Sequence, residues 1–198
     1  MNRATPTDNL LAILESWEPA RWGAVERCIR QGADPATASR VDGGTILHRA
    51  AVDASHTALR WALKKTQADG LAKRCLLGLT PLMWAAKSGN FQAVVLLGKV
   101  DPGGPFSRQH CLPFGTPLHL AASSGHLHCV QSLVHQGADI TALDSYGRTH
   151  IVCAILNRRI GASEALRAAM EAEREELHHL WLTEYASVLV ERIKDSFQ

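Results

Sequence analysis

The sequence lacks the features that would send it across or into a membrane. Residues 1–17 contain no apolar run like the central region of a secretory signal. The longest stretch without a formal charge, residues 109–138, contains prolines, glycines and histidines, which the core of a bilayer would not accept. We therefore expect no transmembrane helix and a cytoplasmic location, with the nucleus as the alternative compartment.

A strong excess of charge of either sign is also absent. The chain has 198 residues, 21 Lys and Arg against 19 Asp and Glu, and a formal net charge of +2. This balance does not indicate a polyanionic partner, so nucleic acid is the least favoured binding class. The charges are nevertheless unevenly divided, because residues 1–162 hold 17 basic and 11 acidic side chains and residues 163–198 hold 4 and 8. An acidic partner, or a tail that shields the array from one, would suit this division.

No motif of a known catalytic centre is present. The chain has no nucleophile elbow, no phosphate-binding loop ending in Lys-Ser or Lys-Thr, and no His-Glu-x-x-His helix. Gly103-Gly104 is followed by Pro105 and Phe106, which rules it out as a phosphate loop. The sequence therefore predicts a protein that is not an enzyme.

Metal and disulfide chemistry have little support as well. Ten histidines are present, and the densest groups are His126 and His128 with Cys129, and His110 with Cys111, but none has the spacing of a zinc site. Five cysteines, an odd number, lie mostly in apolar segments, which favours reduced and buried thiols. We expect no metal and no cofactor.

An internal repeat organises the chain. Thr45, Thr80, Thr116 and Thr149 each begin a similar stretch: TILHRAA, TPLMWAA, TPLHLAA and THIVCAI. These threonines are spaced 35, 36 and 33 residues apart. The third unit is the clearest, because it continues through Ser-Ser-Gly-His and an apolar stretch to a closing Gly-Ala-Asp at residues 137–139.

This motif and its period resemble the ankyrin repeat over roughly residues 9–160. The resemblance implies an all-α solenoid of stacked helix-turn-helix units. It places an N-terminal cap at about residues 8–34 and repeats that begin near residues 45, 80, 116 and 149, so that the array spans residues 1–162. Residues 163–198 would form a C-terminal helical cap or extension.

The residues of the motif explain why such units form. Thr supplies an N-cap oxygen, and Pro at the first helical position needs no amide hydrogen. Paired alanines allow the first helix to approach its neighbours closely, and a glycine such as Gly125 ends it in a left-handed conformation. Trp22 falls in register with Phe91 and Leu127, so we expect it to belong to the core.

Two segments depart from the repeat. Fifteen residues separate Asp101 from Thr116, whereas 10 or 11 separate the equivalent residues of the other units. The resulting loop 102–115 is either a binding loop or a tolerated insertion. Residues 163–197 contain no Gly or Pro and predict a long helix or a helical pair that caps the array, with recruitment of a partner or dimerisation as alternatives.

The resemblance also implies that the concave surface binds a partner protein through the inner helices and the turn tips. Trp84 is the predicted anchor, because tryptophan buries a large area at an interface; the alternative is a rim position packed by the neighbouring inner helix. The predicted partner-binding residues are Arg49, Asp53, Leu79, Trp84, Lys87, Ser88, Phe106, Arg108, Phe114, Ser124, Tyr146, Arg148 and Asn157.

The predicted function is a non-catalytic protein–protein interaction module that acts as an adaptor or scaffold. The alternative is a dedicated inhibitor or immunity-type protein that blocks one enzyme or effector with the same surface. The sequence identifies neither the partner nor the oligomeric state, although the C-terminal helix is a candidate dimerisation element.

Overall fold

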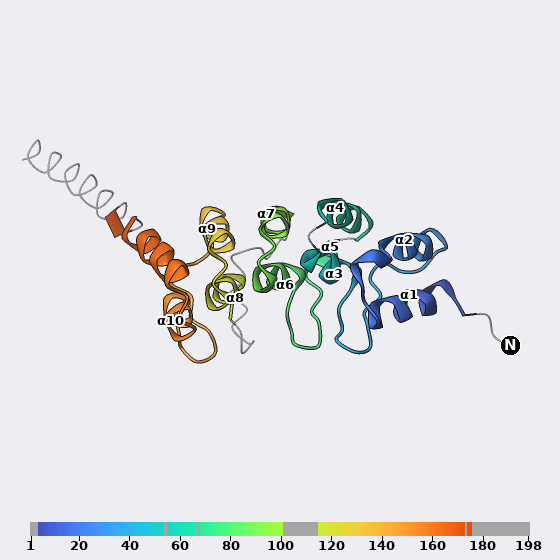
Figure 1. Cartoon of the computed structure of the whole chain (residues 1–198), viewed down its shortest axis with the longest axis horizontal. Helices are drawn as coiled ribbons and strands as arrows, with labels where there is room; N and C mark the ends of the chain where they lie inside the picture. The colour runs from blue at the N-terminus through green and yellow to red at the C-terminus, as the bar shows by residue number, and fades with distance from the viewer. Residues whose placement is uncertain (1–3, 54, 67, 101–114, 173, 176–198) are drawn as a thin grey trace, which may run out of the picture.

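The computed structural model describes residues 4–53, 55–66, 68–100, 115–172 and 174–175, which fold into helices without any strand (Figure 1). The helices are α1 (Pro6–Glu15), η1 (Pro19–Arg21), α2 (Trp22–Arg30), α3 (Ile46–Val52), α4 (His56–Lys65), α5 (Ala68–Leu71), α6 (Pro81–Ser88), α7 (Phe91–Val100), α8 (Pro117–Ser124), α9 (Leu127–His135) and α10 (His150–Leu156). Residues 160–172 are also helical.

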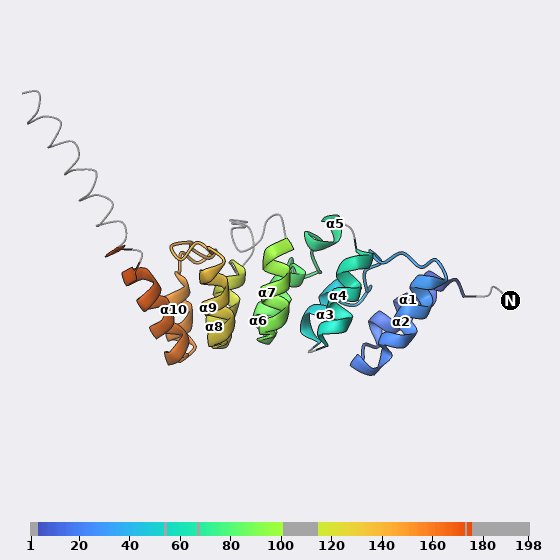
Figure 2. The same ribbon diagram turned by 90° about the horizontal axis from the view of Figure 1, so that it is seen from above.

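The helices stack in two rows, as Figures 1 and 2 show. An inner row runs from α1 through α3, α6 and α8 to α10, and an outer row contains α2, α4, α7 and α9. Each inner helix from α3 onward packs against the next inner helix and against its own outer partner where it has one. Loops at residues 39–44, 75–79 and 144–148 project from the inner row, away from the outer row (Figure 1). We call these loops the turn tips. The fold is an all-α repeat solenoid.

Four inner helices begin directly after a motif threonine. Thr45, Thr80, Thr116 and Thr149 are the N-caps of α3, α6, α8 and α10, each with an extended backbone. The Thr80 hydroxyl accepts a hydrogen bond from the Met83 amide, as an N-cap side chain does. At the other end of α6 and α8, a left-handed glycine stops the helix, which only glycine does without strain.

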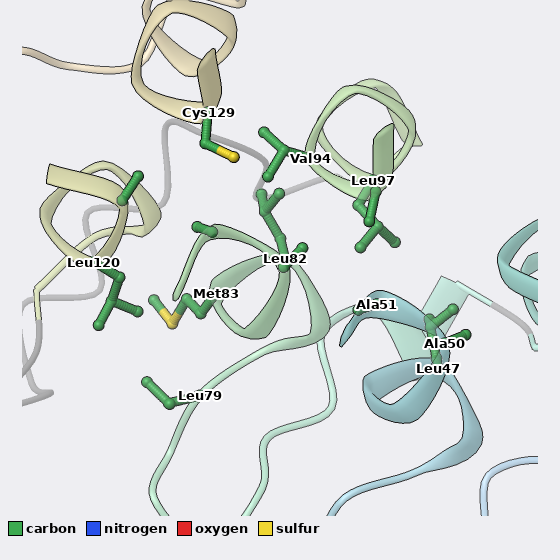
Figure 3. Close-up of a cluster of buried hydrophobic side chains, with 14 of the residues drawn as sticks. Leu47, Ala50, Ala51, Leu79, Leu82, Met83, Val94, Leu97, Leu120 and Cys129 are labelled. Carbon is green, nitrogen blue, oxygen red and sulfur yellow. The ribbon is translucent and has the colours of Figure 1, made fainter. Parts of the chain in front are cut away.

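One continuous apolar core runs through the array. It extends from Leu10 in α1 to Leu166 in the C-terminal helical segment, so every repeat contributes to it. Figure 3 shows its middle, where Leu82 of α6 lies near Val94 and Leu97 of α7. The alanine pair Ala85–Ala86 is fully buried, which lets neighbouring helices approach closely.

Buried histidines join the repeats through hydrogen bonds. His48 Nδ1 accepts from the Thr45 amide at 3.2 Å, so its Nε2 carries the hydrogen and donates to the Leu79 carbonyl of the next turn tip at 3.0 Å. His119 repeats this arrangement with the Thr116 amide at 3.1 Å and the Arg148 carbonyl at 3.0 Å. Each histidine thus fixes the tip of the following repeat on its own inner helix.

A third histidine completes this network at the C-terminal end. The Thr116 hydroxyl lies 3.0 Å from His119 Nδ1 and 3.2 Å from His150 Nε2, and the two rings are 3.8 Å apart. Burial lowers the pKa of His150 to about 3 and that of His48 to about 4, and it also lowers the pKa of His119. These imidazoles are therefore neutral at pH 7.

The repeat that begins at Thr80 lacks this device. Met83 occupies the position of His48 and His119, and its thioether cannot donate a hydrogen bond to the equivalent carbonyl, which belongs to Gly115. Met83 is 1 % exposed and packs in the core instead. The junction between α6 and α8 therefore has no histidine bridge from position 83, although His126 Nε2 donates to the Lys87 carbonyl at 3.1 Å at the other end of α6.

The helical segment 160–172 packs on the C-terminal end of the array. Ala162 and Leu166 are buried and belong to the common core, while Ala165 and Ala169 pack against it. The described part of the predicted C-terminal extension therefore covers apolar surface that the last repeat would otherwise expose. The rest of the predicted extension, residues 176–198, lies outside the described residues.

Replacing His119 by Leu tests the role of the histidine bridges. The Thr116 amide and the Arg148 carbonyl would lose their buried partner, so we expect the free energy of unfolding to fall by about 3 kcal/mol. Urea unfolding followed by circular dichroism measures this change. Met83→Leu is the matched control, because it removes no hydrogen bond and should cost less than about 1.5 kcal/mol. Equal losses in the two variants would contradict the bridge.

The histidine pKa values predict stability that falls in acid. An unfolded chain binds these protons near pH 6.5, whereas folded His48 and His150 bind them only near pH 4 and pH 3. Protons therefore favour the unfolded state as the pH falls below about 6.5. Urea midpoints measured at pH 7, 6, 5 and 4.5 should decrease stepwise. A midpoint that does not change with pH would refute the prediction.

Candidate functional site

A pocket of about 330 Å³ lies on the inner surface between α3, α6 and the turn tip that joins their repeats. Val52 comes from the end of α3, and Trp84 and Lys87 come from α6. We call this feature the α3–α6 pocket. Its lining residues are Val52, Leu77, Leu79, Trp84, Lys87 and Ser88. Four of the predicted partner-binding residues, Leu79, Trp84, Lys87 and Ser88, thus line one pocket.

Trp84 has one side in the pocket and the other in the core. Its ring is half-buried and packs against the common core. The His48 ring meets it edge-on with centroids 5.2 Å apart, and the Arg49 guanidinium lies 5.5 Å from its centroid. The sequence predicted either a binding anchor or a rim position packed by the neighbouring inner helix. Trp84 has features of both positions, because it is packed by α3 and also lines an open pocket.

Arg49 joins the N-terminal cap to the first full repeat. Its guanidinium pairs with Asp42 at 2.8 Å, donates to the Leu14 carbonyl at 2.8 Å and lies 6.0 Å from the Trp17 ring. The side chain is only 13 % exposed. Arg49 was predicted as a partner contact, but these contacts give it a structural role, since its charged group is already surrounded.

Asp53 is also engaged within the chain. It accepts a hydrogen bond from the Trp22 indole and another from the Ser55 amide. Its own carbonyl accepts from the Asn90 side chain at 2.7 Å, which holds the start of α7 against the end of α3. Trp22 lies between Trp17 and Trp61 and packs against the core, as its register predicts.

Leu79, another predicted partner contact, lies at the buried side of the pocket. Its side chain is 1 % exposed, and it forms the floor of the α3–α6 pocket and lies near Met83 in Figure 3. The reason is that Leu79 directly precedes the N-cap of α6, where the His48 bond to its carbonyl draws the chain into the core. Its neighbour Leu77 is 56 % exposed and lines the pocket instead.

The last turn tip brings Tyr146 and Arg148 together. The Arg148 guanidinium lies 4.6 Å from the centroid of the Tyr146 ring, which is 70 % exposed. Arg148 pairs through Nη2 at 2.7 Å and Nε at 2.8 Å with Asp144, whose side chain is almost fully buried. Burial opposes ionisation of Asp144, but hydrogen bonds from Arg148 and Tyr146 lower its pKa to about 2.

Of the remaining predicted residues that the structure describes, Ser88 lines the pocket and the others do not. Ser88 donates to the Ala85 carbonyl at 3.1 Å, and Asn157 donates to the Cys153 carbonyl at 2.7 Å. Ser124 is the last residue of α8, and Asn157 is the C-cap of α10. Neither of them lines the α3–α6 pocket. Phe106, Arg108 and Phe114 lie outside the described residues.

The list of predicted partner-binding residues leaves out the exposed apolar residues of the pocket and its adjoining tips. Val52 and Leu77 are 46 % and 56 % exposed, and Val41 and Leu76 on two tips are 69 % and 71 % exposed. The available signal was a leucine pair, Leu76-Leu77, within a turn that otherwise favours polar residues. Large apolar side chains gathered on an exposed surface are typical of interaction sites.

Metal and thiol chemistry gain no support from the described residues. They contain no group of three or more His, Cys, Asp or Glu placed to hold a metal ion. Cys28, Cys75, Cys129 and Cys153 are buried free thiols, and burial raises the pKa of Cys129 to about 11. None of the helices within the described ranges is long and apolar enough to cross a bilayer.

Family comparison agrees with this architecture. A model described as ankyrin repeats in three copies matches residues 19–105, and one described as a single ankyrin repeat matches residues 115–145. The chain belongs to the ankyrin repeat family. Ankyrin repeats form protein–protein interaction modules, so the chain contains such a module.

Individual relatives share only parts of their length with this chain. Ankyrin repeat and SOCS box protein 12 of Mus musculus is 57% identical over 35 residues, which are 18% of this chain and 11% of that protein, and the Homo sapiens protein gives the same values. Probable E3 ubiquitin-protein ligase XBOS32 of Oryza sativa subsp. japonica is 27% identical over 131 residues, covering 65% of this chain and 24% of that protein.

The Arg49→Met variant tests the structural role of this arginine. It would leave Asp42 and the Leu14 carbonyl without their charged partner, so we expect a loss of about 2–3 kcal/mol in the free energy of unfolding. Arg60→Met on the exposed face of α4 is the control and should change stability by less than about 0.5 kcal/mol. Chemical denaturation measures both. An Arg49 variant that is as stable as the control variant would contradict the structural role of Arg49.

Proposed function

We propose that this chain is a non-catalytic adaptor or scaffold that binds a partner protein through the α3–α6 pocket and the adjoining turn tips. The observation that carries the proposal is the exposure of Val52 and Leu77 beside the half-buried Trp84. Solvent-exposed apolar side chains around an aromatic ring are the usual centre of a protein interface.

The form of the site supports a protein segment over a small cofactor. A volume of about 330 Å³ is at the lower end of the range of small-molecule sites, about 300–1,000 Å³. The exposed apolar surface also continues beyond the pocket to Val41 and Leu76 on two tips. A segment of a protein could place one side chain in the pocket while its neighbours contact the tips.

The similarity to a probable E3 ubiquitin-protein ligase supports the same interpretation. Only 24% of that protein's length is matched. We attribute the shared part to the repeat module and assign no ligase activity to this chain. We also propose a cytoplasmic location, supported by four buried cysteines that remain free thiols, as expected in a reducing compartment.

The test uses residues that line the pocket without belonging to the core. Trp84→Ala is a poor probe, since it would also remove contacts with His48 and Arg49. Val52→Ser combined with Leu77→Ser should leave the melting temperature within about 3 °C of wild type, because both side chains are largely exposed. This double variant should weaken partner binding by about 2 kcal/mol, or roughly thirtyfold.

Affinity capture with the intact chain supplies the partner, and calorimetry with that partner supplies the affinity. Val100→Ser on the outer helix α7 is the matched control, because Val100 is 49 % exposed and lies in the other row. The control should bind as the wild type does. A partner that binds the double variant and the wild type equally would refute the pocket as the binding site.

A further inference from the structure

We propose that the α3–α6 pocket accepts a bulky apolar side chain from an acidic segment of the partner protein. This inference rests on the function proposed above and adds the chemistry of the partner. It is supported by where the basic side chains lie, by the smaller number of acidic side chains beside them, and by which apolar residues remain exposed.

The basic charge of the chain is concentrated in the two repeats that form the pocket. Residues 56–100 contain seven Lys and Arg but one acidic residue, Asp69. The rest of the chain contains 14 basic and 18 acidic residues. The formal charge is therefore +6 in this central segment and −4 elsewhere, although the chain as a whole is nearly neutral. Four of the seven basic residues lie on the outer helices α4 and α7, and the other three, Lys73, Arg74 and Lys87, lie beside the turn tip and in α6. Together they attract an acidic partner over several ångströms.

Basic groups of this segment stand at both ends of the pocket. Lys87 lines the pocket at the end of α6 and is exposed. At the turn tip, Arg74 donates to the Gly78 carbonyl at 3.2 Å, which places its guanidinium next to the pocket residue Leu77. The neighbouring Lys73 is exposed and reaches the Ala36 carbonyl at 2.6 Å. An acidic segment that crosses the pocket would meet positive charge at either end.

Fewer acidic than basic residues lie near the pocket. Asp42 is paired with Arg49 at 2.8 Å, so this pair has no net charge. Asp53 directly follows the pocket residue Val52 and accepts hydrogen bonds from the Trp22 indole and the Ser55 amide, neither of which carries a charge. The residues that line the pocket include Lys87 and no Asp or Glu.

The apolar lining determines what fills the centre. Val52, Leu77, Leu79 and Trp84 surround a space that is bordered by only two polar residues, Lys87 and Ser88. A leucine, phenylalanine or tryptophan side chain would remove this apolar surface from water, whereas a carboxylate placed there would lose its hydration. The preferred segment is thus apolar at its centre and acidic on its flanks.

A phage-displayed library of random 12-residue peptides, selected on the full chain, tests this chemistry directly. We expect enriched peptides to contain Leu, Phe or Trp with at least two Asp or Glu within about four residues of it. Binding of a synthetic copy of an enriched peptide should weaken about tenfold between 50 and 300 mM salt, because ions screen the flanking charges. Enriched peptides with neutral or basic flanks would overturn the proposal.

Two charge variants of the full chain locate the interaction. Lys73→Glu combined with Lys87→Glu should weaken peptide binding at least about tenfold. Lys64→Glu combined with Lys65→Glu changes the net charge equally on the outer helix α4 and should weaken it by less than about threefold. Equal effects of the two pairs would mean that only net charge matters, which would overturn the assignment to the pocket.

A second occupant is distinguished in the same assay. If the acid-rich C-terminal part of this chain filled the pocket, Glu184→Gln combined with Glu191→Gln would raise peptide affinity, and that gain would overturn the assignment to a separate partner.

Capture of the partner distinguishes a failure of the proposed function from a failure of the acidic preference. If Val52→Ser with Leu77→Ser abolishes capture of the partner but the lysine variants do not, the pocket stands as the binding site and only its acidic preference fails.

Discussion

The hydrogen bond from His48 to the Leu79 carbonyl determines where the pocket residues lie. It connects the inner helix of one repeat to the turn tip of the next, and it keeps the segment 75–79 against α3. That segment supplies both the floor of the α3–α6 pocket, Leu79, and its exposed wall, Leu77. This bond pattern requires a neutral His48 ring, because Nδ1 accepts a hydrogen bond while Nε2 donates one. Burial keeps the ring neutral by lowering its pKa, so it also helps to hold the pocket residues in place.

Several residues of the inner surface serve stability and recognition together. Trp84 closes the core over His48 and also lines the pocket, while the adjacent Arg49 fastens the N-terminal cap through Asp42 and Leu14. Binding surfaces on repeat proteins are rows of neighbouring helices, so each surface residue has packing partners on both sides. Recognition is left to the residues that point beyond these contacts, here Val52 and Leu77.

The fold could be predicted from the sequence because its signals are local. The threonine N-caps, the glycine stops and the period fix the start of each inner helix within a few residues of chain. The site was predicted only in part. Arg49 meets Leu14, which is 35 residues away, and Leu79 is buried by a bond from the preceding repeat. Such partners depend on how the repeats stack, which no single motif encodes.

The contact between α6 and α8 differs from its neighbours because Met83 stands where they have a histidine. Histidine bridges brace the contact of α3 with the tip before α6 and the contact of α8 with the tip before α10, but the sulfur at position 83 braces nothing across the contact of α6 with α8. At the other end of α6, a hydrogen bond from His126 Nε2 to the Lys87 carbonyl at 3.1 Å crosses the same contact, so this contact is held at a different place from its neighbours. All the residues that line the α3–α6 pocket precede α8 in the sequence, so the pocket forms without any residue of α8.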